Sequence, residues 1–305
     1  RLLKGLEPVI PSLHQRIDHI FQHQLYGIAI TELTSLLSRR GVYCSKYPNS
    51  KYSVTGFNNA EGNIRFKRIP HIWKNTKCVY CGASQNQYDR DLSLETHAYE
   101  LIHTSDPKEL KNMKFDVIVG NPPYQISDGG GMGTSAIPLY DKFVLQAMKL
   151  RPRYLSMIIP SRWFSGGKGL DRFRSMMLEN QNIRQLVDYF NAEECFPGID
   201  LSGGVCYFLW DRDNKGDCLV TSIREAKRTE MSRPLLETGT QTFVRFSEAI
   251  AVVRKIAEFH EESFEIIVSA RKAFGDITDA EILQENTTGA VKIYSYPKRG
   301  FILRS

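Results

Sequence analysis

The segment FDVIVGNPPYQ, residues 115–125, constrains the fold more than any other part of this sequence. The apolar residues 117–119 predict a buried strand, and Gly120 ends it. Asn121 and two prolines follow, and prolines remove backbone donors and fix φ. A strand that stops in this way is typical of the edge at which open α/β sheets bind their ligands.

The residues of this loop have a chemistry that suits an amino group. Because Pro122 and Pro123 hold the backbone, the Asn121 side chain and the Pro122 carbonyl can both point at one small group. Two acceptors that converge on an NH₂ make a weak amine more nucleophilic. Tyr124 offers a flat face on which a planar ring can stack. The alternative is a stiff loop with a capping Asn, which the strict order of strand, Gly, Asn, Pro, Pro and Tyr disfavours.

The rest of the chain alternates strand and helix patterns, which predicts a doubly wound α/β sheet. The predicted strands are 24–30, 115–120, 154–160, 183–190 and 203–211, and the predicted helices are 31–41, 137–150 and 170–180. Residues 44–105 are polar and rich in Tyr and Asn, so we interpret them as an insertion. An amphipathic helix at 246–262 is expected to connect two domains.

Composition excludes several classes of protein. The 305 residues are 42% hydrophobic and 24% charged, which is ordinary for a soluble globular chain. The apolar runs are far shorter than the roughly 20 residues that span a membrane, and the chain opens without a signal-peptide pattern. The six cysteines are not spaced as in a small secreted scaffold, so we expect a reducing cytoplasm. The net charge of +6 is a mild lean towards polyanions.

The insertion contains a candidate zinc site. Cys78 and Cys81 are two residues apart and a glycine follows, which is a tight turn whose amides can support two thiolates on one metal. Zinc takes four ligands. The expected ligands are Cys44, His71, Cys78 and Cys81. His97 and His103 are the rival donors. A redox pair or a site without metal are the alternatives, although the two cysteines do not open a helix as a thioredoxin-like pair would.

The sequence NPPY after an FDVIVG strand resembles motif IV of the N6-adenine DNA methyltransferases of the γ arrangement, from bacterial type II or IIG-like restriction–modification systems. The resemblance implies a class I methyltransferase fold with a Rossmann-like doubly wound sheet. It implies transfer of a methyl group from S-adenosylmethionine to an adenine flipped out of double-stranded DNA. The catalytic residues would be Asn121, Pro122, Pro123 and Tyr124, and Tyr124 and Phe196 would stack on the base.

The resemblance also implies a domain organisation. Residues 1–240 would be the catalytic domain, N-terminally incomplete, with 44–105 as its zinc-binding insertion. Residues 241–305 would be a connector helix and the start of a target-recognition domain, whose first part we expect at 263–275. An endonuclease domain or subunit is expected elsewhere in the full-length protein, and no membrane partner is expected.

Two features depart from the family pattern, and both concern the cofactor. The Gly-rich cofactor motif of the family is not found here, so we expect the chain to begin after it, to bind S-adenosylmethionine weakly and to be inactive by itself. The resemblance implies an acid at the end of the strand at 24–30 that holds the cofactor ribose, but Ala29 stands at that place. Thr31 and Glu32 are the nearest polar candidates.

Two other functions fit the same residues. A methyltransferase that modifies a glutamine side chain of a protein could use the same loop, because an amide NH₂ suits the same two acceptors. Such enzymes are usually compact, so the sequence after residue 240 and the insertion favour the DNA enzyme. A non-catalytic fragment that binds DNA is the other alternative, which the lack of a cofactor motif keeps open.

Overall fold

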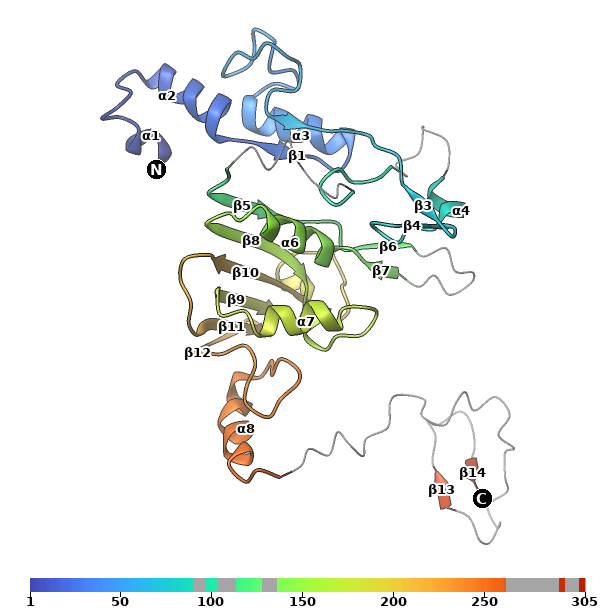
Figure 1. Ribbon diagram of the computed structural model, residues 1–305. Coiled ribbons are helices and arrows are strands. Elements are labelled where there is room, and N and C mark those ends of the chain that lie inside the picture. The colour runs from blue at the N-terminus through green and yellow to red at the C-terminus, as the bar shows by residue number, and fades with distance from the viewer. Residues whose placement is uncertain (90–96, 104–113, 128–135, 262–290, 294–301, 305) are drawn as a thin grey trace. The chain divides into compact units, whose positions relative to one another are not determined.

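The computed structural model describes most of the chain as a mixed α/β protein (Figure 1). The described residues are 1–89, 97–103, 114–127, 136–261, 291–293 and 302–304. Internal contacts divide the chain into two units, Arg1–Ala251 and Val252–Ser305. No helix of the described part is long and apolar enough to cross a bilayer.

A six-stranded mixed sheet forms the centre of the first unit, in the order β12-β11-β9-β10-β8-β5. Its strands are β5 (Val117–Gly120), β8 (Tyr154–Pro160), β9 (Ile183–Tyr189), β10 (Val205–Asp211), β11 (Cys218–Arg224) and β12 (Lys227–Arg233). Strand β5 is parallel to β8, and β11 is parallel to β9. Strand β10 runs antiparallel to both of its neighbours. The strands predicted around residues 115–120, 154–160, 183–190 and 203–211 are therefore confirmed.

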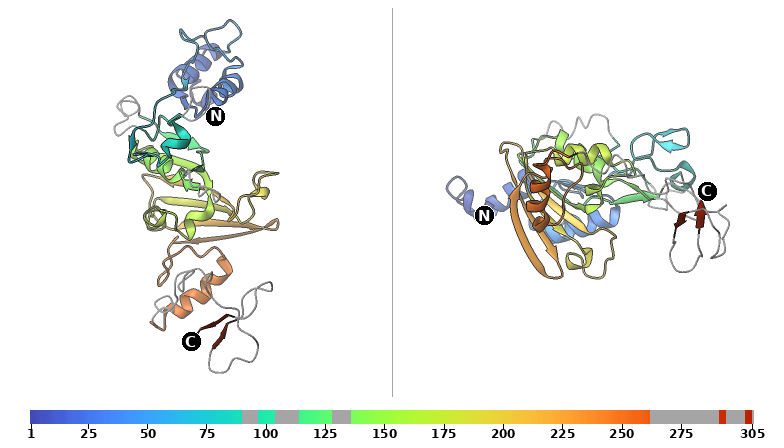
Figure 2. Two further views of the ribbon diagram at one scale, coloured as in Figure 1. Left: turned by 90° about the vertical axis from the view of Figure 1, so that its right-hand side faces the viewer. Right: turned by 90° about the horizontal axis from the view of Figure 1, so that it is seen from below.

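The main hydrophobic core lies between this sheet and two helices, α6 (Tyr140–Lys149) and α7 (Asp171–Leu178) (Figures 1 and 2). Helix α6 contributes Tyr140, Val144 and Ala147, whose spacing places them on one face of the helix. The sheet and α7 contribute Leu155, Ile159, Leu186, Phe208, Phe173 and Met177. The short helix η2 (Ser161–Phe164) closes the core after β8 with the buried Trp163.

The helix predicted at 137–150 begins later than expected. Residues 137 and 138 of the predicted helix belong instead to strand β7 (Ala136–Pro138), which pairs antiparallel with β6 (Gln125–Ser127). Helix α6 itself begins at Tyr140. The prediction was wrong there because the amphipathic period of α6 continues the apolar pattern of β7. The resulting hairpin follows the loop at 121–124 directly.

The N-terminal part of the first unit is helical with a small sheet of its own. It contains α1 (Leu2–Gly5), α2 (Leu13–His19), the π-helix η1 (Ile20–Gln24), β1 (Gly27–Ile28), α3 (Glu32–Tyr43) and β2 (Ile64–Arg65). Strand β1 is shorter than the predicted strand 24–30 because η1 extends to Gln24, and it pairs in parallel with β2.

Strand β5 is the last strand of the six-stranded sheet. Among the described strands it pairs with β8 alone, and β1 lies in the separate two-stranded sheet. Val117 and Val119 are 56% and 73% exposed, whereas Ile118 packs against the core. The prediction of a strand here is confirmed, but the prediction that it is buried was wrong, because only one face of β5 is covered.

The predicted insertion, residues 44–105, has little regular secondary structure among its described residues. It contains a hairpin of β3 (Trp73–Lys74) and β4 (Lys77–Cys78), followed by the single-turn helix α4 (Gln85–Tyr88). A second hydrophobic cluster joins it to the β6–β7 hairpin and α6, with the buried members Cys78, Cys81, Ala83, Ile102, Ile126, Leu139 and Phe143.

Helix α8 (Ile250–Ala257) follows the short helix η4 (Ser247–Ala249) and occupies part of the predicted connector at 246–262. In the second unit β13 (Val291–Ile293) pairs antiparallel with β14 (Ile302–Arg304). The predicted start of a recognition domain at 263–275 lies outside the described residues.

Candidate active site

The loop at 121–124 leaves the carboxyl end of β5 and enters β6 at Gln125. Its last carbonyl, that of Tyr124, accepts a hydrogen bond of 3.1 Å from the amide of Leu139 at the start of α6. Strand β5 holds the other end through its ladder to β8, in which Gly120 is opposite Met157. Backbone pairing therefore fixes the loop on both sides.

The loop forms one wall of a pocket of about 440 Å³, within the range of small-molecule sites. The lining residues are Ile30, Asn121, Pro122, Pro123, Tyr124, Gln125, Ala192, Phe196, Ile199 and Leu201. All predicted catalytic and base-stacking residues thus meet in one place. The wall is mostly apolar, with two amide side chains, which suits a flat ring that carries a polar edge.

Polar atoms of the loop are available to a ligand. Asn121 is exposed, and neither its side chain nor the Pro122 carbonyl has a hydrogen-bond partner among the residues that the structure describes. The Tyr124 hydroxyl is buried and also has no partner within this part of the chain. Burial, with smaller contributions from Cys195 and Cys206, raises the pKa of Tyr124 to about 12. The phenol is therefore neutral at physiological pH and is not a general base.

Phe196 reaches the pocket from the connection between β9 and β10. The short helix η3 (Ala192–Glu194) positions it, since the Phe196 amide donates to the Ala192 carbonyl at 2.8 Å. Asn191 caps this helix by accepting from the Glu193 amide at 3.0 Å. The aromatic ring that the resemblance assigns to base stacking is thus held by a local hydrogen-bonded turn.

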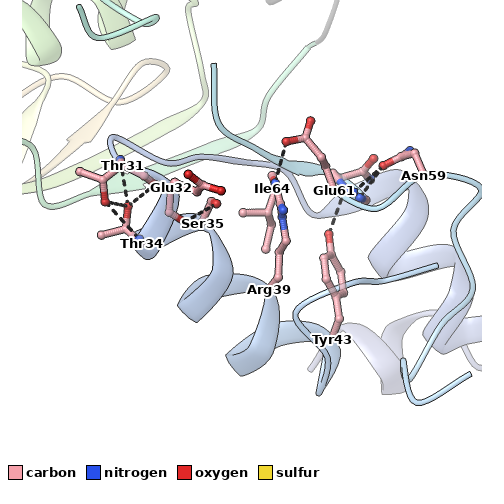
Figure 3. A network of polar contacts seen from close by, with 11 residues as sticks. Thr31, Glu32, Thr34, Ser35, Arg39, Tyr43, Asn59, Glu61 and Ile64 are labelled. Atoms are coloured by element: carbon pink, nitrogen blue, oxygen red, sulfur yellow. Dashed lines mark hydrogen bonds and ion pairs between the residues drawn. The ribbon is translucent and has the colours of Figure 1, made fainter. Parts of the chain in front are cut away.

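Thr31 and Glu32, the predicted cofactor contacts, form the start of α3 (Figure 3). The Thr31 hydroxyl accepts from the Thr34 amide at 3.1 Å, and the Thr31 amide donates to the Thr34 hydroxyl at 3.1 Å. Glu32 is exposed in the first turn, where a negative charge favours the helix dipole. Their neighbour Ile30 lines the pocket, whereas Thr31 and Glu32 do not.

Replacing Thr31 with Ala is expected to destabilise the protein by about 1 kcal/mol, because it removes the cap of α3. Thr31→Ser keeps the hydroxyl and should have wild-type stability in thermal or urea unfolding. Unchanged stability of Thr31→Ala with a loss of S-adenosylmethionine binding would show that the residue is a ligand contact rather than a cap.

The predicted metal ligands are brought together only in part. His71, Cys78 and Cys81 are buried and share their site with His103, and the ligand atoms of the four residues all lie within 4.8 Å of one another. Burial raises the pKa of Cys81 to about 12 and lowers that of His103 to about 4.

The other two candidates of the insertion lie elsewhere. Cys44 is not a member of this group: it is exposed at the end of α3, with a left-handed φ of 61°. His97 is not a member either, and its Nε2 lies 2.7 Å from the Ile30 carbonyl, next to the pocket. The structure thus replaces the predicted Cys44 by the rival donor His103.

Comparison with known proteins assigns the chain to a family. The profile of the Eco57I restriction-modification methylase family matches residues 23–196, more than half of the chain. The chain belongs to this family. The matched residues include the whole 121–124 loop and Phe196, so the Eco57I-type region is the region that builds the pocket.

Two curated relatives support the assignment. An adenine-specific methylase from Mycoplasma pneumoniae is 35% identical over 258 residues, which are 76% of this chain and 61% of that protein. The type II restriction enzyme and methyltransferase RM.Eco57I from Escherichia coli is 25% identical over 228 residues, 67% of this chain and 22% of that protein. The chain thus spans less than two thirds of the length of each relative.

Solved structures of restriction–modification proteins are also similar to this Eco57I-type chain. The methyltransferase subunit of a type I system from Streptococcus thermophilus is 15% identical, and the match covers 55% of this chain and 36% of that subunit. The TM-score of 0.30 is too low to equate the two folds.

Proposed function

We propose that this chain is the methyltransferase part of a restriction–modification protein that methylates the exocyclic amino group of adenine in double-stranded DNA. The observation that supports this most is the pocket, because Asn121, Tyr124 and Phe196 line it together. On this proposal the six-stranded sheet belongs to a class I, Rossmann-like methyltransferase fold, with the reacting base bound at the carboxyl end of β5.

The chemistry assigned to the loop is positioning and electrostatic stabilisation. The Asn121 side-chain oxygen and the Pro122 carbonyl accept the two amino hydrogens, which increases the electron density on the amino nitrogen as it attacks. Tyr124 and Phe196 hold the base ring between them, and Pro123 keeps the loop rigid. S-adenosylmethionine, when bound, supplies the activated methyl group. Thr31 and Glu32 stay the proposed polar contacts to it, since they adjoin the pocket residue Ile30.

The proposed partners are DNA and a nuclease. Binding an adenine in this pocket requires the base to leave the duplex, which costs a few kcal/mol. The net charge of +6 favours a polyanionic partner. We propose that residues 1–240 are the catalytic domain and that 241–305 contain the start of a target-recognition domain. We also propose that an endonuclease domain or subunit lies elsewhere in the full-length protein, and that the protein is cytoplasmic.

A protein glutamine methyltransferase is the second candidate. A glutamine amide would satisfy Asn121 and Pro122, but it has no ring to place between Tyr124 and Phe196. A non-catalytic DNA-binding fragment is the third candidate, and an Asn121 side chain that lines the pocket without a hydrogen-bond partner among the described residues does not favour it. The family and its adenine-specific relative favour the first function.

The decisive assay supplies the full-length protein with S-adenosylmethionine carrying a labelled methyl group, and with either duplex DNA or a glutamine-containing peptide. Mass spectrometry of the digested DNA should find N6-methyladenine in one sequence context. Label on the peptide, or on cytosine, would contradict the proposal.

Replacing Phe196 with Ala is expected to weaken binding of the flipped base by about 1–3 kcal/mol, the usual contribution of one base–aromatic stack. Fluorescence of 2-aminopurine at the target position should report less extrahelical base. Phe246→Ala is the control, because Phe246 is 48% exposed and does not line the pocket. Tyr124→Phe should behave as wild type, since no described group pairs with the hydroxyl; equal effects of Phe196→Ala and Phe246→Ala would refute the stacking role.

A further inference from the structure

Two tight turns, one before β4 and one after it, bring the sulfur atoms of Cys78 and Cys81 together. Asn75 and Thr76, both with positive φ, turn the chain from β3 into β4. The Cys78 carbonyl accepts from the Gly82 amide at 2.9 Å, and Gly82 has a φ of 80° that side chains disfavour. The Ala83 amide donates to the Cys81 sulfur at 3.4 Å, an arrangement that stabilises negative charge on the sulfur.

The two histidines reach the same point from both sides of the insertion. His71 Nδ1 lies 3.4 Å from Cys81 Sγ, and its ring stacks on Trp73 with 4.8 Å between the centroids. The ring of His103 meets that of His71 edge-on at 5.1 Å. Four metal-binding side chains that are each at most 8% exposed therefore converge in one buried volume.

The orientation of His103 identifies which of its nitrogens is available. Its Nδ1 lies 2.8 Å from the Tyr99 carbonyl, which can only accept, so Nδ1 carries the proton. In the neutral ring Nε2 is then a free acceptor, and this buried atom has no hydrogen-bond partner among the described residues. A backbone carbonyl that fixes one ring nitrogen while the other is left to a cation is the usual support of a metal-bound histidine.

We propose that His71, Cys78, Cys81 and His103 bind one structural Zn²⁺ ion in a closed tetrahedral site. Two thiolates and two imidazoles suit zinc, and they leave no open position for a substrate water. Zn–S and Zn–N bonds of about 2.3 and 2.0 Å place neighbouring ligand atoms about 3.5 Å apart. The 3.4 Å between His71 and Cys81 already meets this spacing.

The proposed zinc site is connected to the candidate active-site loop through a shared hydrophobic cluster. Cys78, Cys81 and Ile102 belong to one hydrophobic cluster with Ile126 of β6 and Phe143 of α6. Strand β6 follows the 121–124 loop without an intervening residue. Loss of the ion is therefore expected to loosen the cluster that holds β6, the strand that the loop enters, and Leu139, whose amide donates to the Tyr124 carbonyl.

The test measures metal in the full-length protein purified without chelator and does not depend on methyl transfer. Elemental analysis should find about one zinc per chain. Cys81→Ser should reduce the zinc content at least tenfold, and Cys44→Ser is the matched control that should retain it, because Cys44 is exposed and outside the group.

A second variant decides the ligand set even if Cys81→Ser fails to fold. Cobalt bound in place of zinc should give thiolate-to-cobalt charge-transfer absorption, and His103→Cys should bind cobalt with roughly 1.5-fold stronger absorption, because three thiolates replace two. Absence of both zinc and cobalt–thiolate absorption from the wild-type protein overturns the proposal. Loss of metal from Cys44→Ser, or a Cys78–Cys81 disulfide in non-reducing mass spectrometry, overturns it as well.

Discussion

Methyl transfer by the full-length protein should fall by at least about 10²–10³-fold when Asn121 is replaced with Ala, the usual effect of removing one preorganised polar group from a transition state. Asn121 is the exposed polar end of the pocket, and its side chain is not engaged by other described residues. The substitution therefore removes no hydrogen bond or ion pair among the residues that the structure describes. DNA affinity should be unchanged, because phosphate contacts provide most of it.

Single-turnover rates with labelled S-adenosylmethionine, together with filter binding of DNA, separate these two effects. Gln125→Ala is the matched control, because Gln125 is the other exposed amide that lines the pocket. It should retain most of the rate. A near wild-type rate for Asn121→Ala would exclude Asn121 as an acceptor for the reacting amine, whatever the fate of the Gln125 variant.

Replacing Arg245 with Ala is expected to lower the free energy of unfolding by about 3 kcal/mol, because it leaves a buried carboxylate without its counter-charge. Arg245 binds Asp188 through two nitrogens at 2.7 and 2.8 Å, and Ser161 donates to the same carboxylate at 2.7 Å. Asp188 is fully buried in β9, and burial raises the pKa of its carboxyl against the effect of Arg245.

Urea unfolding followed by circular dichroism would measure this loss. Arg228→Ala is the control: Arg228 pairs with Glu230 at 2.6 Å, but both side chains are exposed on β12. An exposed pair of this kind is screened by solvent, so the control should unfold almost as the wild type does. Equal stability of the two variants would show that the Asp188 pair is not needed to hold β9.

The strands of the main sheet could be predicted where the apolar pattern is unambiguous. Strand β8 has the predicted bounds, 154–160. The hairpin β11–β12 escaped prediction because its turn is formed by Glu225 and Ala226, both with positive φ. Asn-Gly or Asp-Gly would have marked such a turn, whereas Glu-Ala does not.

The candidate site could be predicted where residues are adjacent in sequence and less well where they are distant. The 121–124 loop and Phe196 were located from short motifs, and one pocket contains both. The group of His71, Cys78, Cys81 and His103 could be predicted only in part. Nothing in the spacing distinguishes Cys44 from His103, because the choice depends on where α3 ends and on the turn that presents His103. The signal that could have favoured His103 is its short distance in sequence from Tyr99, whose carbonyl orients the ring.

The exposed side of β5 has a consequence for handling the protein in solution. A strand edge that has no partner among the described strands, with exposed valines at 117 and 119, can pair with a strand of another molecule, and neither lysine nor proline interrupts it within Val117–Gly120. The two prolines begin immediately after the strand, so an added strand can extend along β5 but cannot continue its hydrogen bonds past Gly120. Association through this edge would therefore involve a short paired segment and would increase with protein concentration. The candidate active-site loop would stay outside the paired segment.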